Sequence, residues 1–360
     1  MPESRLSRAA SIGVILMITT VVLIYFKELL KPLAVAFIIG YIIRALQGYI
    51  GRLKIQGKPL HRMISGTLSI LLIFLALQIT INLIVDNLTQ MVKNYKQYED
   101  SYEVFMVTIG DFIGVDRLGD KFIGRLEMID IQEYLQGVIS SLTAVLGNLV
   151  LIVIYIIFIL LEEVTFKAKM EKLFTTSSQR ERFSRISEQI FVSTNKYITL
   201  KTFVSFLTGF LSYLVLVLIG VDYAFLWAFL IFLFNYIPYI GSLIATVLPA
   251  IFALLQFGSF WPFFWVLVLV EAIQLIVGNY VEPKVIGKSL NLSPLVVVIT
   301  LSFWGALWDI LGMIISVPIT SIMLIVLAQF PFTRSVAILL SEHGDIDDLV
   351  VKDLPPEPKA

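Results

Sequence analysis

The 360-residue chain contains no cysteine, only two histidines and few charged residues. The absence of cysteine excludes disulfides, thiolate catalysis and cysteine-ligated metal sites, and two histidines are too few for a histidine-rich metal centre. Charged residues make up 15% of the chain and hydrophobic residues 58%, against about 25% and roughly 45–50% in ordinary soluble domains. These values exclude a globular soluble enzyme, a disordered chain and a nucleic-acid-binding protein. They predict an integral membrane protein with several helical spans.

The sequence also lacks the motifs of common catalytic and ATP-driven proteins. It has no GxxxxGK[ST] phosphate-binding loop, no GxSxG elbow and no HExxH zinc motif. The missing nucleotide-binding loop disfavours a pump that hydrolyses ATP, and no nucleophile–base pair is visible. We therefore expect a protein that is not an enzyme and that uses no cofactor and no metal.

Long uncharged runs are abundant, and several are long enough to cross about 30 Å of hydrocarbon. They comprise residues 9–26, 63–85, 134–161 and 202–221, followed by 48 residues without a charge at 223–270. We predict an all-α, polytopic helical membrane protein of about eight spans, with broken or re-entrant helices in the C-terminal half. Residues 223–257 and 295–330 fit either full spans or re-entrant hairpins, which are tolerated where they are buried in protein or line a cavity.

Charged loops predict the orientation of the chain. Residues 44–62 carry five basic and no acidic side chains, and residues 162–201 carry eight basic and five acidic side chains. Residues 86–133 carry ten acidic and five basic side chains, and so belong on the opposite side of the membrane. Because basic loops stay in the cytoplasm, we expect both termini to be cytoplasmic. This orientation requires the first two hydrophobic runs, the second ending at Ile43, to form a hairpin.

Two polar segments have amphipathic periodicity. In the acidic segment, hydrophobic residues recur at alternating steps of three and four, as in a heptad seam: Leu88, Met91, Tyr95, Tyr98, Tyr102, Phe105, Ile109 and Phe112. This seam fits either a helix that lies on its own membrane domain or a contact helix between protomers. In the basic segment, Phe183, Ile186 and Ile190 mark a helix that we expect along the inner membrane surface.

The most informative motif interrupts the 48 uncharged residues, and it reads Asn235-Tyr236-Ile237-Pro238-Tyr239-Ile240-Gly241-Ser242. Pro238 cannot donate a helical hydrogen bond and frees the carbonyl of Phe234. Exposed backbone polar groups cost several kcal/mol each in hydrocarbon, so such a break should face a cavity or a neighbouring helix. The motif fits either a turn between spans at the membrane surface or a broken helix that helps to bind a polar solute. Gly and Pro interruptions that recur in hydrophobic segments are typical of transporter substrate sites.

Acidic side chains are few in the C-terminal membrane half. Glu271 lies in the middle of the run 261–281, where a carboxylate costs roughly 2.5–3.5 kcal/mol on the insertion scale. It shares a helical face with Gln274, three residues later. Glu271 fits either a protonated carboxyl bonded to a neighbouring helix or a site that couples to protons or cations. Asp309 fits either a surface turn or a second coupling site.

Taken together, the broken-helix motifs resemble the autoinducer-2 exporter family. The similarity runs through Asn235 to Ser242, Gln274, Gly278-Asn279, Glu282-Pro283-Lys284, Gly287, Leu290, Leu292-Ser293-Pro294, Trp304-Gly305, Gly312-Met313 and Ser316-Val317-Pro318. It implies an oligomeric transporter of the bacterial inner membrane with about eight spans. Family functions include export of the furanone-type quorum signal autoinducer-2 and, in some members, sodium/proton exchange. Asp309, where the pattern usually has glycine, and Val277, where many members carry an acid, depart from it.

The residues and the resemblance together favour a secondary transporter that exports a small polar solute such as autoinducer-2. In this hypothesis the break motif faces Gln274, Asn279 and Glu282, and a proton gradient is coupled through acidic residues. The solute site comprises Asn235, Tyr236, Pro238, Tyr239, Gly241, Ser242, Gln274, Asn279, Glu282 and Pro283, and the ion-coupling residues are Glu271 and Asp309. The expected partners are the lipid bilayer, the solute, H⁺ or Na⁺ and further copies of the chain, with no nucleic acid. The alternatives are a sodium/proton antiporter and an oligomeric scaffold, organised by the seam, that transports nothing.

These features divide the chain into five regions. Residues 1–85 form an N-terminal helical hairpin plus a third span, and residues 86–133 an extracytoplasmic amphipathic helical segment. Residues 134–201 hold a fourth span and the cytoplasmic amphipathic helix, and residues 202–334 a transport core with broken helices. Residues 335–360 are an acidic cytoplasmic tail that we expect to be disordered.

Overall fold

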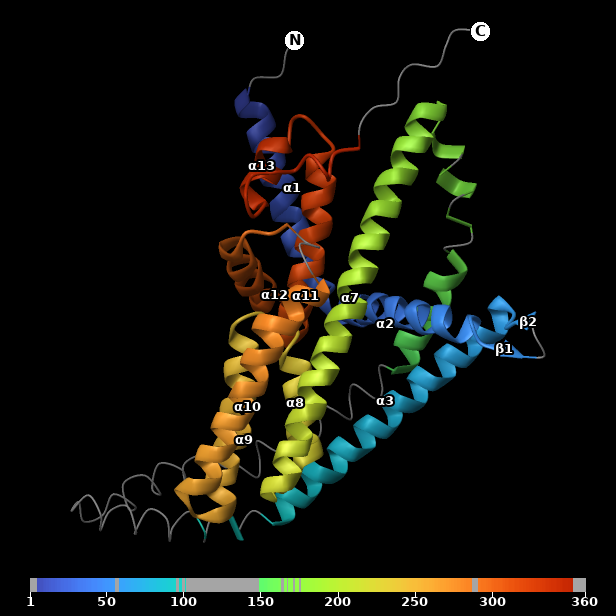
Figure 1. The fold of residues 1–360 in the computed structure, drawn as a ribbon. Helices are drawn as coiled ribbons and strands as arrows, with labels where there is room; N and C mark the ends of the chain where they lie inside the picture. The colour runs from blue at the N-terminus through green and yellow to red at the C-terminus, as the bar shows by residue number, and fades with distance from the viewer. Residues whose placement is uncertain are drawn as a thin grey trace. The chain divides into compact units, whose positions relative to one another are not determined.

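The computed structural model describes residues 5–55, 58–94, 97–98, 101, 149–162, 165–166, 168–170, 172–174, 176–286 and 291–351. Nearly all of this described chain is helical (Figure 1). The helices are α1 (Arg5–Tyr25), α2 (Lys27–Gly51), α3 (Arg62–Lys93), α7 (Ser177–Ile219), α8 (Ala224–Phe234), α9 (Ile240–Phe257), α10 (Phe260–Ile276), the π-helix η1 (Val277–Val281), α11 (Glu282–Ile286), α12 (Pro294–Ala328) and α13 (Arg334–Leu340). A pair of two-residue antiparallel strands, β1 (Lys54–Ile55) and β2 (Lys58–Pro59), lies between α2 and α3.

Membrane-spanning helices dominate the described residues. Six are long and apolar enough to cross a membrane: Lys27–Gly51, Met63–Lys93, Ser177–Ile219, Ile240–Phe257, Phe260–Val285 and Pro294–Ala328. Three shorter apolar helices cover Gly13–Tyr25, Leu149–Glu162 and Ala224–Phe234. Many large apolar side chains on these helices are exposed, which suits contact with lipid chains that are as apolar as leucine. The predicted all-α polytopic membrane fold is confirmed.

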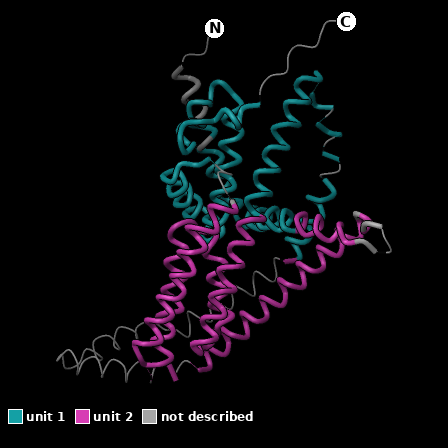
Figure 2. Tube along the Cα trace, viewed as in Figure 1, with its two compact units in different colours: residues 1–42, 150–198, 289–360 teal, residues 43–149, 199–288 magenta. Residues whose placement is uncertain are grey.

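The chain separates into two compact units (Figure 2). Unit 1 comprises Met1–Ile42, Val150–Ile198 and Ser289–Ala360, and unit 2 comprises Ile43–Leu149 and Thr199–Lys288. In unit 2, α9 packs against both α8 and α10, and α3 packs against α8. In unit 1, α12 packs against α13 and α1. The core of unit 2 includes Leu216, Ile231, Phe252, Val266 and Val270.

The described part of the predicted seam packs into the core of unit 2. Leu88 packs with Leu226, while Met91 and Tyr98 join the cluster around Phe252. The ring of Tyr98 meets that of Phe252 edge-on, with centroids 5.2 Å apart. These positions favour a segment that lies on its own membrane domain rather than a contact between protomers. The other seam positions, Tyr95, Tyr102, Phe105, Ile109 and Phe112, lie outside the described residues.

Two expectations for the N-terminal half and for the basic segment are wrong. Phe26 alone separates α1 from α2, and its N–H and carbonyl make helix-type bonds to Val22 and Leu30 (both 2.9 Å). No residue is left for a reversing loop, so α1 and α2 meet at a corner instead of forming a hairpin (Figure 1).

The basic segment around Phe183 is not a separate surface helix, because it continues without interruption into the apolar part of α7. At 1.5 Å per residue, α7 measures about 65 Å, roughly twice the hydrocarbon thickness, so its basic half extends beyond the span.

The acidic tail is not disordered up to Val351. Residues 341–351 return to the end of α12, where the buried side chain of Gln329 binds their backbone. The Gln329 Nε2 donates to the Leu349 carbonyl (2.6 Å), and its Oε1 accepts from the Val351 N–H (3.1 Å). Ile346 is buried as well. Because these contacts use backbone groups, the acidic composition of the tail did not reveal them.

Candidate functional site

The break between α8 and α9 is the tip of a helical hairpin in unit 2. After α8 ends, the carbonyl of Phe234 accepts a hydrogen bond from the N–H of Ile237 (2.8 Å). At the open end, Gln256 accepts from the Asp222 N–H (2.7 Å) and donates to the Gly220 carbonyl (2.9 Å). The 11 residues of α8 measure about 16 Å, only about half of the hydrocarbon thickness. The geometry favours a re-entrant hairpin with a broken helix over two full spans.

Two residues make the sharp reversal at the tip possible. Tyr239 has φ 63° and ψ −59°, a backbone conformation that side chains rarely adopt. At Gly241 an added Cβ would lie 1.9 Å from the Phe234 carbonyl oxygen, so only glycine fits. The Tyr239 side chain is exposed, and Pro238 is half-buried. These three predicted site residues shape the tip, and its polar contacts come from their neighbours.

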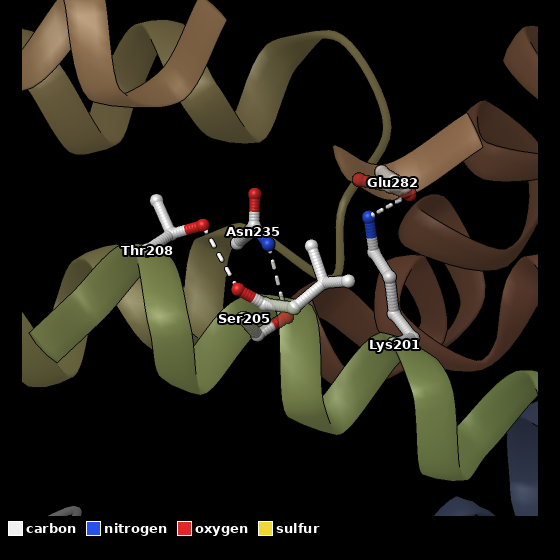
Figure 3. A network of polar contacts seen from close by, with 6 residues as sticks. Lys201, Ser205, Thr208, Asn235 and Glu282 are labelled. Atoms are coloured by element: carbon white, nitrogen blue, oxygen red, sulfur yellow. Dashed lines mark hydrogen bonds and ion pairs between the residues drawn. The ribbon is translucent and has the colours of Figure 1, made fainter. Parts of the chain in front are cut away.

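The polar side chains at the tip point toward α7. Asn235 Nδ2 donates to Ser205 Oγ (3.0 Å), as Figure 3 shows, and the Tyr236 hydroxyl donates to Thr202 Oγ1 (2.7 Å). The sequence predicted Asn235 and Tyr236 as site residues, but it placed them opposite Gln274. The structure brings them together with α7 instead.

A buried polar row on α7 was missed by the sequence analysis. We define the α7 polar row as Lys201, Ser205, Thr208 and Ser212, all at most 5% exposed. These residues recur at steps of four, three and four, which places them on one face of the helix; Figure 3 shows the first three on one side. Among the described residues, the Ser212 hydroxyl is buried without a hydrogen-bond partner. The opposite face exposes Phe203, Phe206 and Phe210. The helix α7 therefore has a polar buried face and an apolar exposed face. The sequence analysis missed this difference because it considered only the absence of charge in the run 202–221.

An ion pair closes one end of this row. Lys201 Nζ lies 2.5 Å from Glu282 Oε1, and the two side chains are 7% and 26% exposed (Figure 3). The pair joins α7 to α11, across 81 residues of sequence. Removing two charges from water is expensive unless they are paired. Glu282, a predicted site residue, therefore lies at one end of the α7 polar row, and Lys201 is an additional candidate site residue.

A second polar cluster joins α9 to α10. Glu271 Oε2 accepts a hydrogen bond from Thr246 Oγ1 (3.0 Å). Gln274 Nε2 donates to Thr246 Oγ1 and to the Ser242 carbonyl, both at 3.1 Å. Glu271, Gln274 and Ser242 were predicted as site residues, and the structure brings these three together. These contacts match the interpretation of Glu271 as a carboxyl group that is hydrogen-bonded to a neighbouring helix.

The remaining predicted site residues belong to neither group. Asn279 and Pro283 are exposed. Asp309 belongs to unit 1, where it interrupts α12 with φ 57° and pairs with Lys31 at 3.0 Å. Its side chain is 78% exposed, which matches a surface turn. No group of three or more metal-binding side chains occurs within the described ranges.

Comparison with known proteins agrees with this architecture. The family model "AI-2E family transporter" matches residues 12–332. The AI-2 transport protein TqsA of Escherichia coli K12 is 29% identical over 318 residues, which cover 88% of this chain and 90% of TqsA. A candidate transport protein of Haemophilus influenzae is 33% identical over 298 residues, covering 80% and 84% of the two chains. The candidate transport protein YrrI of Bacillus subtilis is 24% identical over 319 residues, covering 84% and 87%. With a match across nearly its whole length, the chain belongs to the AI-2E family of membrane transporters.

Proposed function

We propose that the protein exports a small, uncharged polar solute of the autoinducer-2 type and that unit 2 carries the solute site. The observation behind this proposal is the α7 polar row, buried in an apolar helix and facing the tip residues Asn235 and Tyr236. The site offers hydroxyl and amide groups, and its one ion pair carries no net charge. Such a set of directional polar groups suits a neutral solute with several oxygen atoms. The name of the Escherichia coli relative supports autoinducer-2 as the first solute to test.

The distribution of charged residues indicates which side of the membrane each segment faces. Basic segments at 44–62 and 162–201 favour a cytoplasmic position, and the acidic segment 86–133 favours the outside. We propose a bacterial inner-membrane protein with a cytoplasmic C-terminus on this basis, whereas a cytoplasmic N-terminus stays a prediction, because α1 and α2 do not form the hairpin that it requires. Assembly with further copies of the chain stays a prediction of the family resemblance.

Release of autoinducer-2 from loaded liposomes that contain the purified protein tests the solute site. Asn235→Ala removes an amide that would hydrogen-bond to the solute, which costs about 0.5–1.5 kcal/mol of binding. We expect release to slow about two- to tenfold at solute concentrations below saturation. Asn87→Ala is the matched control, because among the described residues the Asn87 amide donates to the Leu83 carbonyl of its own helix. Equal release by the two variants would refute the assignment.

Coupling to protons is proposed for Glu271, the carboxyl within α10. Glu271→Gln keeps an oxygen that can accept from Thr246 but cannot exchange a proton. With an imposed pH gradient, we expect release by this variant to lose its response to the gradient while downhill release persists. A gradient response that is unchanged would rule Glu271 out.

Sodium/proton exchange is the second candidate, and the same cluster favours it. The Glu271 carboxylate, the Thr246 hydroxyl and the Ser242 carbonyl supply oxygen atoms, the ligand type preferred by hard cations. Exchange predicts that added Na⁺ restores the fluorescence of a quenched pH dye in inverted vesicles. A solute exporter without sodium coupling gives no such signal.

A further inference from the structure

One turn of the helix that leads to Glu282 differs from the rest. In η1, the N–H of Glu282 donates to the carbonyl of Val277, five residues earlier. In an α-helix the same N–H would donate to the carbonyl of Gly278, four residues earlier. Single π-helical turns inside α-helices are rare and occur frequently at functional sites. The function proposed above gives no role to η1.

η1 lies between two sets of fixed contacts. Before it, Glu271 and Gln274 are hydrogen-bonded to α9. After it, Glu282 is paired with Lys201 on α7. The winding of η1 therefore determines which face of the helix carries Glu282, relative to the fixed part of α10.

A change in winding would separate this pair. Converting η1 to α-helix removes the extra residue from the turn and rotates Glu282 by about the 100° that one residue occupies. At a side-chain radius of about 5–6 Å, the carboxylate moves by about 8 Å. The contact between Lys201 and Glu282, now 2.5 Å, would not survive that movement.

Gly278 is the residue in η1 that packing does not explain. A Cβ added there would meet no atom within 4 Å, and its φ is not positive. Neither a close approach nor an unusual backbone conformation therefore requires glycine. Because glycine weakens an α-helix relative to alanine, we expect Gly278 to lower the cost of leaving the α-helical register.

We propose that η1 is a register switch. In its π form it holds Glu282 on Lys201; in its α form it withdraws Glu282 and leaves the Lys201 ammonium to donate to oxygen atoms of the solute. The identity of the solute rests on the proposed function, whereas the change in register is independent of it. Gly278 is thus a positioning residue that acts through Glu282.

The switch is measurable by the distance between two spin labels. The chain has no native cysteine, so nitroxides attach only at Phe203→Cys on α7 and Lys284→Cys on α11, both exposed positions in unit 2. Pulsed electron paramagnetic resonance in liposomes gives the distance distribution. Gly278→Ala, in which the methyl group meets open space, should shift the populations roughly fivefold toward the α form. Gly40→Ala in α2 is the matched control, because that helical glycine also faces open space.

The expected result is a change of several ångström in the favoured distance for Gly278→Ala, with Gly40→Ala identical to the parent. Coincident distributions for both variants would overturn the switch. Autoinducer-2 release is measured separately on the unlabelled proteins. A distance shift without any release would support the switch and refute the proposed function, whereas release without a distance shift would refute the switch alone.

Discussion

Replacing Lys201 by methionine removes one partner of the ion pair and leaves Glu282 charged in a site where its side chain is only 26% exposed. Breaking a fully buried pair costs about 3–5 kcal/mol, because an uncompensated charge remains. We expect about 3 kcal/mol for Lys201→Met, since partial exposure lets water reach the carboxylate. In Glu282→Gln the more deeply buried Lys201 ammonium, 7% exposed, loses its partner. This substitution should lower the free energy of unfolding at least as much. The variant with both substitutions removes both charges and should return close to the parental stability.

Unfolding of these variants in detergent, followed by tryptophan fluorescence, completes a double-mutant cycle. With about 3 kcal/mol lost in each single variant and almost none in the double variant, the coupling energy between the two sites should be about 6 kcal/mol. Substitutions at independent sites add within about 0.3–0.5 kcal/mol, so a coupling energy in that range would refute the reasoning. The double variant also separates stability from function. It should fold, yet it should release autoinducer-2 poorly, because the ammonium that donates to the solute is gone.

Three further predictions concern single positions. Gly241→Ala places a methyl group against a carbonyl oxygen 1.9 Å away, so we expect no monodisperse protein by size-exclusion chromatography, whereas Gly278→Ala should elute like the parent. Burial raises the pKa of the Tyr98 phenol, which lies beyond the end of α3, above its ordinary value of 10.0. The stability linked to this proton is complete below about pH 10 and lost above it, so the melting temperature of the parent should fall more steeply between pH 9 and 11 than that of Tyr98→Phe. Asp309→Gly relieves a positive φ that costs about 1–3 kcal/mol and loses an exposed ion pair with Lys31 worth at most about 1 kcal/mol; a fall in stability of more than about 1 kcal/mol would contradict this balance.

The membrane fold and the position of the helix break could be predicted from the sequence because each depends on local chemistry. Charge-free runs indicate spans, and Pro238 cannot donate a helical hydrogen bond, which disfavours an uninterrupted helix at that position. The direction of the side chains at the break could not be predicted. It depends on which helix lies beside α8. Gly209 of α7 approaches Ala228 and Phe232 closely. Asn235 therefore reaches Ser205 on α7 rather than Gln274.

The α7 polar row was missed for a different reason. Ser205, Thr208 and Ser212 are uncharged, so a count of charged residues does not reveal them. They form a row only when their positions around the helix are compared. Lys201 ends the run and resembles an ordinary interfacial lysine, because the partner that explains it lies 81 residues away. A single sequence contains no information about such distant pairing. The backbone contacts that hold the tail to Gln329 are equally invisible in the sequence.

The neutrality of the Lys201–Glu282 pair has an electrical consequence. A membrane potential does work of about 2.3 kcal/mol on each unit charge for every 100 mV that it crosses. The potential exerts opposite forces on the two partners, so a movement that carries them together produces no current. The register change of η1 is different, because it moves the Glu282 carboxylate and leaves Lys201 in place. That step, or a proton carried through Glu271 without a compensating charge, would make export of an uncharged solute depend on voltage.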